Sequence, residues 1–183
     1  MTSVVGLLLA AGAGRRFGSP KALAREPDGT SWLLRSVQAL RPCAEMVVVL
    51  GAEAEQAAAL LPMSVSRIRA DDWAEGMGAS LRAGLLALTP TDHDVALVSL
   101  VDLPDVDAAV VARLVAAATG PDVLARAAYD GVPGHPVLLG RDHWAGVVET
   151  STGDRGARNY LACHEVALVE CGDLATGADV DAR

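Results

Sequence analysis

The sequence is poor in aromatic residues, and this limits what its core can be made of. It has one phenylalanine, three tryptophans and two tyrosines among 183 residues. Because 51% of the residues are hydrophobic, the core must consist mainly of alanine, valine and leucine. Such a composition favours an α/β layer structure over a β-sandwich. The length suits one domain over residues 1–183, and we find no internal repeat or low-complexity linker.

Paired cysteines, an excess of positive charge and long apolar runs are also missing. Cys43, Cys163 and Cys171 are scattered, which argues against a disulfide framework or a zinc site and favours a reducing compartment. The net charge of −8 argues against partners such as nucleic acid or a membrane surface. Since no apolar run could span a bilayer and no signal peptide is recognisable, we expect a cytoplasmic protein.

One segment near the N-terminus concentrates glycine and positive charge. Val4 to Leu9 is a continuous apolar run, which is typical of a strand buried on both faces. Glycines without Cβ atoms allow several peptide N–H groups to converge on one anion, and nearby cations strengthen that binding. The glycines after the strand are Gly12, Gly14 and Gly18, and the cations are Arg15, Arg16 and Lys21. This combination predicts a loop that binds a polyphosphate.

The spacing of this loop excludes two common phosphate-binding patterns. The dinucleotide fingerprint G-x-G-x-x-G fails because the third glycine, Gly18, falls one position late. The pattern G-x-x-x-x-G-K-[ST] fails because Gly18 is followed by Ser19-Pro20-Lys21. Without the cations, the glycines would be equally compatible with a tight connection that binds no ligand.

The same loop carries a family resemblance. Leu9-Ala10-Ala11-Gly12, Arg16, Gly18, Pro20 and Lys21 resemble the signature L-A-A-G-x-S-x-R-M-G-x-P-K of nucleotidyltransferases, in particular the molybdenum cofactor cytidylyltransferases and the related guanylyltransferases. Gly14 replaces the usual serine and removes a hydroxyl, and Phe17 replaces methionine. The resemblance implies that the backbone from Leu9 through Ala13 to Arg15 binds the nucleotide, and that Arg16 and Lys21 neutralise its phosphates.

Strand-like and helix-like segments alternate along the chain. We expect strands at 46–50, 65–69 and 95–100, and helices at about 31–40, 53–61, 79–88 and 106–118, with Ser31 as an N-cap. Residues 123–128 should form a hairpin, through an Asp130-Gly131 turn, with a strand after Pro136, and a last strand should cover 165–170. The prediction is a three-layer α/β/α fold with a mostly parallel, Rossmann-like sheet, of the nucleotide-diphospho-sugar transferase type that the resemblance implies.

A second glycine-containing loop precedes the helix expected at residue 79. Gly76, Gly78 and Ser80 are suited to letting a base or phosphate approach the backbone, although a capping turn with Trp73 as a core plug is an alternative. The resembling family carries N-P-x-W-x-x-G-x-x-x-S here. Trp73, Gly76 and Ser80 match this pattern, whereas Ala70 and Asp71 replace the Asn-Pro pair.

Asp102 is the candidate ligand for a metal. It follows the strand expected at 95–100, and ligands of open α/β sheets bind at the carboxyl ends of the strands. A carboxylate there suits Mg²⁺ when the ligand is a triphosphate. Asp102 could instead cap the following helix, but Asp105 and Asp107 are available for capping. The family has D-Q-P or D-x-P with the aspartate on the metal, and Leu103 replaces the glutamine.

Three later motifs extend the resemblance to the acceptor side. Gly134-His135-Pro136 matches a G-x-P element near the acceptor, although a histidine next to proline is also common as a packed structural residue. Residues 153–158 match G-D-x-G-A-R, which is more typical of the cytidylyl branch and implies acceptor roles for Asp154 and Arg158. Asp179-Val180-Asp181 resembles D-I-D-T-P, with Asp181 as a second metal ligand, although the chain ends two residues later without Thr-Pro.

The resemblance implies a Mg²⁺-dependent transfer of a nucleotide from a nucleoside triphosphate to the phosphate of molybdopterin, with release of pyrophosphate. CTP is favoured as the donor and GTP is possible, and a molybdoenzyme could receive the product. A sugar or alditol phosphate is an alternative acceptor. A non-catalytic nucleotide-binding partner of molybdoenzymes is an alternative of another class.

Overall fold

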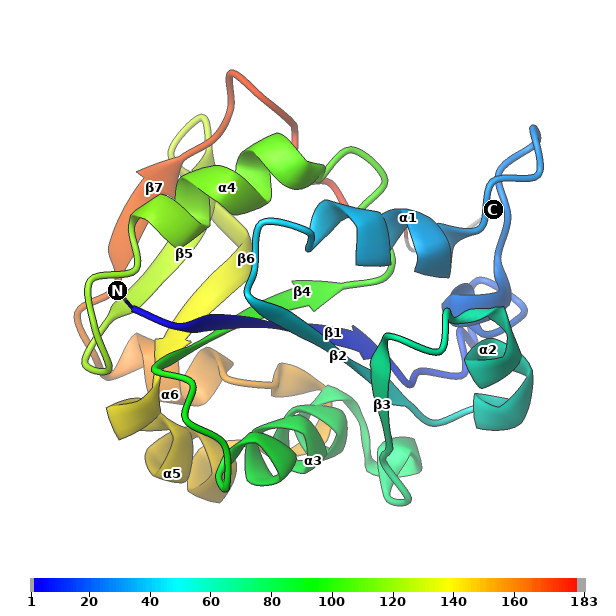
Figure 1. The fold of residues 1–183 in the computed structure, drawn as a ribbon, viewed down its shortest axis with the longest axis horizontal. Helices are drawn as coiled ribbons and strands as arrows, with labels where there is room; N and C mark the ends of the chain where they lie inside the picture. The colour runs from blue at the N-terminus through cyan, green and yellow to red at the C-terminus, as the bar shows by residue number, and fades with distance from the viewer. Residues whose placement is uncertain (1, 181–183) are drawn as a thin grey trace.

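The computed structural model describes residues 2–180 as a seven-stranded sheet between two layers of helices (Figure 1). The order of the strands is β3-β2-β1-β4-β6-β5-β7. Only β6 runs antiparallel to its neighbours, β4 and β5, while the other pairs are parallel. The predicted three-layer, mostly parallel fold is therefore confirmed. The strands are β1 (Val4–Ala10), β2 (Glu45–Leu50), β3 (Ser66–Arg69), β4 (Val95–Leu100), β5 (Leu124–Tyr129), β6 (Val132–Gly140) and β7 (Ala167–Glu170).

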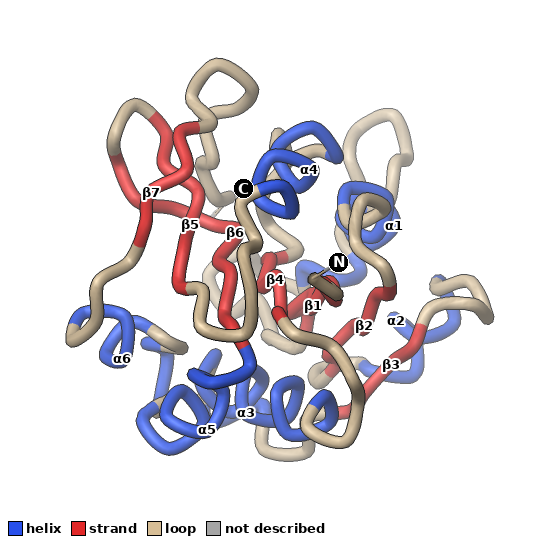
Figure 2. Tube along the Cα trace, turned by 60° about the vertical axis from the view of Figure 1, so that its left-hand side comes forward, coloured by secondary structure: helices blue, strands red, loops and turns tan. Residues whose placement is uncertain are grey.

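The helices cover the sheet on both faces, as Figure 2 shows from the side. One layer contains α1 (Trp32–Ala39), α2 (Ala54–Leu60) and α4 (Ala108–Ala116). The opposite layer contains α3 (Met77–Leu88), α5 (Arg141–Thr150) and α6 (Arg158–Ala162). Three short 3₁₀ turns, η1 (Lys21–Leu23), η2 (Trp73–Glu75) and η3 (Gly153–Arg155), lie in the loops. No helix within residues 2–180 is long and apolar enough to cross a membrane.

The side chains of β1 pack into two hydrophobic cores, one on each face of the sheet. All seven of its residues are buried. Successive side chains of a strand point to opposite faces, so Leu8 packs with the α1 layer and Leu7 with the α3 layer. Burial of both faces is the reason for the continuous apolar run in the sequence. The carboxyl end of β1 is thereby fixed in the middle of the molecule, next to that of β4.

Local capping signals in the sequence are used as expected. The Ser31 hydroxyl accepts a hydrogen bond from the Leu34 amide, at 3.4 Å, and begins α1. The Asp107 carboxylate accepts from the amides of Ala109 and Val110, at 2.8 and 3.3 Å, and begins α4. Because Asp107 caps this helix, Asp102 is not needed for capping.

Two elements differ from the prediction. Helix α5 was not expected, and it begins after Gly140 without a side-chain cap. Strand β6 begins at Val132 and not after Pro136, so the prediction for its start was wrong. Residues 132–133 pair with β5 alone, and pairing with β4 starts at Val137. The first half of β6 therefore behaves as an edge strand, in which proline is tolerated.

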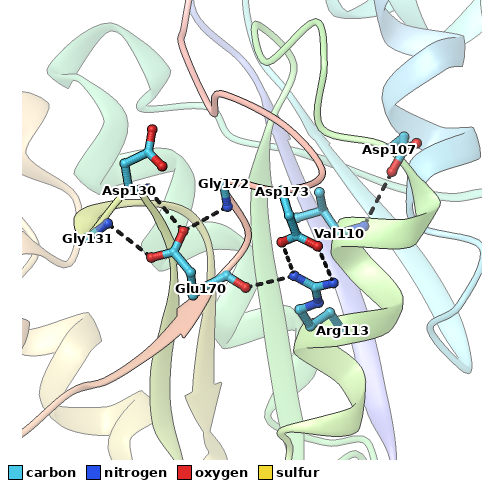
Figure 3. Close-up of polar contacts among 8 residues, drawn as sticks. All are labelled: Asp107, Val110, Arg113, Asp130, Gly131, Glu170, Gly172 and Asp173. Carbon is cyan, nitrogen blue, oxygen red and sulfur yellow. Dashed lines mark hydrogen bonds and ion pairs between the residues drawn. The ribbon is translucent and has the colours of Figure 1, made fainter.

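Polar contacts attach the segment after β7 to the rest of the fold (Figure 3). The Glu170 carboxylate accepts hydrogen bonds from the backbone amides of Asp130, Gly131 and Gly172, at 2.8–3.0 Å. These bonds hold the pKa of Glu170 below its usual value. On α4, Arg113 pairs with Asp173, with 2.9 Å between Nη2 and Oδ2. The segment that follows is thus guided back toward the carboxyl end of β4.

Candidate active site

The loop after β1 folds back on itself through its glycines. Gly14 has φ +61°, and the Gly18 amide donates to the Gly14 carbonyl at 2.7 Å. A Cβ atom on Gly14 would lie 1.9 Å from the carbonyl oxygen of Ser19. The glycine that replaces the family's serine is therefore required by this turn, because any side chain would clash with the backbone.

Lys21 and Asp102 meet at the carboxyl edge of the sheet. Lys21 lies in η1, after the loop, and Asp102 follows β4. Lys21 Nζ is 2.7 Å from Asp102 Oδ2, and the two side chains are only 15% and 16% exposed. The structure thus places the two residues, 81 positions apart in sequence, in direct contact. Their roles in binding phosphate and metal remain predictions.

A cleft of about 590 Å³ runs over this ion pair. Its floor is the end of β1, and its walls are the glycine loop on one side and residues 73–77 on the other. The volume suits a nucleotide, since ligand pockets usually measure 300–1,000 Å³. The lining includes the predicted nucleotide-binding residues Leu9, Ala10, Ala11, Gly12, Ala13, Gly14, Arg15, Arg16, Lys21, Gly76, Ser80 and Asp102.

A second pocket of about 320 Å³ adjoins the cleft, over β6 and α6. Asp154, Arg158 and Asp179 line both spaces, so a molecule in one would contact a molecule in the other near these residues. His135 lines only the second pocket, and its acceptor role stays a prediction. The arrangement offers two neighbouring spaces that meet at Asp154, Arg158 and Asp179.

The environment of His135 keeps its imidazole neutral. Burial and the positive charge of Arg126 lower the pKa of His135 to about 4, although Asp179 acts in the opposite direction. The backbone around it is also fixed. The Tyr129 hydroxyl donates to the carbonyl of His135 at 2.6 Å, and Arg126 Nε donates to that of Gly134 at 3.0 Å. His135 can therefore serve as a hydrogen-bonding group, but it does not add positive charge near neutral pH.

The loop at residues 73–76 is held against residues 151–154 with the help of Arg82 of α3. Arg82 donates to the carbonyl of Ser151 at 2.7 Å and pairs with Glu75 at 2.9 Å. Gly76 has φ +120°, and a Cβ there would lie 2.5 Å from Asp154 Oδ1. Gly78 packs closely too, because a Cβ there would lie 2.9 Å from the Thr152 amide. Gly78, predicted to bind nucleotide, is thus placed against residues 151–153, where it allows the two loops to approach.

Two predicted features require further comment. Asp181, the predicted second metal ligand, lies outside the described residues. The segment leading to it does reach the site, because the Val180 amide donates to the Asp102 carbonyl at 3.1 Å. Trp73, the possible core plug, is partly buried against the core on the α3 side and also lines the larger cleft.

Two site residues were missed by the sequence analysis. Arg126 lines the second pocket from β5, where its signal was a lone charge in the apolar run Leu124–Tyr129. Asp179 lines both spaces, and its signal was the D-x-D pattern, from which the sequence analysis selected Asp181. Neither residue could be assigned from spacing alone, because their neighbours in space are distant in the chain.

The residues present are compatible with a magnesium ion held jointly with a nucleotide. Within residues 2–180, no group of three or more histidine, cysteine, aspartate or glutamate side chains is arranged to hold a metal by itself. Mg²⁺ does not need such a cage, since it is usually bound through one or two carboxylates and substrate phosphates. Asp102, at the cleft and facing the glycine loop, supplies a carboxylate of that kind.

Comparison with known proteins identifies the family. The model of the MobA-like NTP transferase domain matches residues 6–169. The chain belongs to this family. A solved structure of a protein from Mycobacterium sp. strain JC1, a homologue of Rv0371c from Mycobacterium tuberculosis, superposes with a TM-score of 0.82. That protein is 29% identical, and the match covers 98% of this chain and 90% of the other.

Two relatives of the chain carry different names. Nicotine blue oxidoreductase from Paenarthrobacter nicotinovorans is 37% identical, over 97% of this chain and 92% of the relative. A probable molybdenum cofactor guanylyltransferase from Rhodopirellula baltica is 36% identical over 56% of this chain and 49% of the relative. The recognition of a nucleotidyltransferase domain from the glycine loop is thus confirmed, while the substrates remain to be assigned.

Proposed function

We propose that the protein transfers a nucleotide from a nucleoside triphosphate, with CTP as the preferred donor, to the phosphate of a molybdopterin-type acceptor. The observation that supports this most directly is the contact of Lys21 with Asp102 beneath the glycine loop. It brings a cation, a carboxylate and a bend rich in backbone amides to one end of the nucleotide-sized cleft. Those are the groups that a triphosphate and its metal require.

The reaction asks for positioning and charge neutralisation more than for acid or base catalysis. An oxygen of the acceptor phosphate attacks the α-phosphorus in line, the bond from the α-phosphorus to the bridging oxygen breaks, and pyrophosphate leaves with that oxygen. The attacking phosphate is already ionised at neutral pH, so no general base is needed. Arg16 and Lys21 neutralise the phosphates, and the amides around Gly12–Gly14 hold the leaving pyrophosphate.

Asp102 would hold a divalent metal, Mg²⁺ in this proposal, which when bound withdraws negative charge from the phosphates. The carboxylate also holds Lys21 at 2.7 Å, and this contact orients the ammonium group toward the cleft. Asp179, and Asp181 beyond the described residues, are further carboxylates for the same region.

Support for the cytidylyl branch comes from residues 153–158. These residues match the G-D-x-G-A-R motif, and Asp154 and Arg158 lie where the cleft and the second pocket meet. The relative from Rhodopirellula baltica is named a guanylyltransferase, so GTP is the competing donor.

Pyrophosphate release with each of the four nucleoside triphosphates, Mg²⁺ and molybdopterin tests the assignment. We expect release with CTP to exceed that with GTP by at least about tenfold, which corresponds to 1.4 kcal/mol of discrimination. A preference for GTP would overturn the assignment of the donor. Mg²⁺-dependent binding of CTP without turnover would instead indicate a nucleotide-binding partner of molybdoenzymes.

A second candidate function rests on the relative named nicotine blue oxidoreductase, which is 37% identical over nearly the whole chain. A redox enzyme with this fold would need a reductant, and a reduced nicotinamide dinucleotide is the probe we choose. Oxidation of NADH or NADPH in the presence of a quinone-like dye, followed by its absorbance, distinguishes the two candidates. Dye-dependent oxidation without pyrophosphate release from any triphosphate would favour the oxidoreductase.

A further inference from the structure

We propose that Arg82 is a positioning residue that couples the cleft to the second pocket, so that a nucleotide bound in the cleft orders the segment at residues 151–158. This inference rests on the proposed function, because that function places a nucleotide in the cleft. It goes beyond that function by assigning to the fold a link between the two spaces. Arg82 lines neither space, so its effect on both must pass through the segments that it holds.

Arg82, in α3, holds a different segment with each end of its guanidinium group. Nη1 donates to the carbonyl of Ser151 at 2.7 Å, and Nη2 pairs with the Glu75 carboxylate at 2.9 Å. The side chain of Arg82 is 27% exposed, whereas that of Glu75 is 59% exposed. Exposed ion pairs are weak, while a hydrogen bond from a charged donor to the carbonyl of a buried residue is stronger. The bond to Ser151 therefore fixes the planar guanidinium, and the fixed group positions Glu75.

The two segments that Arg82 joins form walls of different spaces. Residues 73–77 line the cleft, and residues 154–158 line the second pocket. Asp154 and Arg158 line both spaces, at the place where the two meet. A displacement of either segment would therefore change the shape of its own space and of this meeting point.

The backbones of the two segments are also in close contact. A Cβ atom on Gly76 would lie 2.6 Å from the carbonyl oxygen of Gly153. A Cβ atom on Gly78 would lie 2.9 Å from the amide nitrogen of Thr152. Because so little space separates them, a shift of one segment must move the other, since packed surfaces do not deform continuously.

The segment at residues 151–158 depends on this support because its own hydrogen bonds are few and weak. The Ser151 hydroxyl is buried and has no hydrogen-bond partner in the described part of the chain. In the turn η3, the Arg155 amide reaches the Thr152 carbonyl at 3.4 Å, which is long for such a bond. Segments held in this way open locally at low cost. A ligand that fixes residues 73–77 should thus also order the neighbouring segment.

Amide hydrogen exchange on the whole chain, followed by NMR, tests the coupling in the free protein. Glu75→Gln removes the charge pair without touching the second pocket, because Glu75 lines only the cleft. We expect the amides of Ser151 and Arg155 to exchange at least about threefold faster in this variant. The double variant should exchange no faster than Arg82→Gln alone, because both changes act through one contact.

Addition of Mg²⁺ and the α,β-methylene analogue of CTP tests whether a nucleotide uses this link. The analogue should slow exchange at Ser151 and Arg155 at least about tenfold in the wild type, but less than about threefold in Arg82→Gln. Arg82→Lys should restore part of the effect, because lysine keeps the charge but cannot hold both partners in one plane. If Arg82→Gln does not fold, Glu75→Gln takes its place with the same expected loss.

Arg67→Gln is the matched control. Arg67 also donates to a backbone carbonyl, that of Ala58, at 2.9 Å, but it lines neither space. This variant should show the exchange rates of the wild type at Ser151 and Arg155, with and without the analogue. Failure of the analogue to bind the wild type would contradict the proposed function, and the rates in the free protein would then decide the inference alone.

Three results would overturn the inference. The first is unchanged exchange at Ser151 and Arg155 in Glu75→Gln. The second is equal slowing by the analogue in the wild type and in Arg82→Gln. The third is an equally large acceleration at the amides of β1 in Glu75→Gln, because that would show a general loss of stability and not a link between two segments.

Discussion

Replacing Asp102 with asparagine separates the proposed catalytic role of this residue from its structural one. At 2.7 Å and an effective dielectric constant of about 20, the direct attraction between Lys21 and Asp102 is about 6 kcal/mol. Because both groups are largely removed from water, desolvation offsets most of it and leaves about 1–2 kcal/mol of net stability. For a chain of this length that amounts to a fall in Tm of roughly 2–8 °C.

The effect on activity should be much larger than the effect on stability. Without the carboxylate, neither the metal nor the ammonium group of Lys21 is held at the phosphates. Removing one such electrostatic group commonly lowers kcat by about 10²–10³. We therefore expect pyrophosphate release by Asp102→Asn to fall at least about 100-fold, with the circular dichroism spectrum of the wild type retained.

Asp107 provides the matched control, since it lies in the same loop, five residues later. Its carboxylate caps α4 and lines neither binding space. Asp107→Ala should lose about 1 kcal/mol of stability, as expected for an N-cap, with turnover close to that of the wild type. Turnover by Asp102→Asn within tenfold of the wild type, or equal losses in the two variants, would refute the role of Asp102.

Three other perturbations probe neighbouring features. Gly14→Ser restores the family's serine, but Gly14 has φ +61° and the Ser19 carbonyl occupies the place of a side chain. The loop would have to change its conformation, so calorimetry should show at least about tenfold weaker binding of the α,β-methylene analogue of CTP. His135 has its pKa lowered to about 4, so its contribution to stability is complete above pH 6.5 and is lost as pH falls toward 4. That loss is at most about 3 kcal/mol, and urea unfolding of His135→Gln should show a flatter decline over this range. Glu170→Gln replaces the carboxylate that accepts hydrogen bonds from three backbone amides. Hydrogen exchange at the amides of Asp130, Gly131 and Gly172 should accelerate, and unchanged protection would show that these bonds contribute little.

The parts of the site formed by consecutive residues could be predicted from the sequence. The apolar run of β1, its glycines and its cations are adjacent in the chain, so composition alone marks them as a loop at a strand end. Asp102 was predicted for a similar reason, because it directly follows the apolar strand β4. The carboxyl ends of β1 and β4 lie at the same edge because the two strands are parallel. The alternation of strands and helices in the sequence predicts such a parallel sheet.

The parts that depend on distant residues could not be predicted. Arg126 lines the second pocket because β5 lies beside β6, where the Gly134 carbonyl accepts from its Nε, and this neighbour is not encoded in the run around Arg126. Helix α5 was not predicted for a different reason. Among its ten residues only Trp144 and Val147 are buried, and its N-cap is Gly140, so neither periodicity nor capping gave a signal.

The two binding spaces differ in how firmly the fold holds them, and this bears on how the family can vary its substrates. The larger cleft stands on β1 and β4, which are central and almost wholly buried. The second pocket shares part of that base, but much of its lining comes from residues 154–158 and from the segment after β7, which is attached by exposed polar contacts such as the bond from Arg113 to the Glu170 carbonyl. Substitutions in those exposed segments disturb few core contacts, so the shape and charge of the second pocket can change while the glycine loop is preserved. A shared nucleotidyltransferase domain among relatives with different names is what this arrangement leads one to expect.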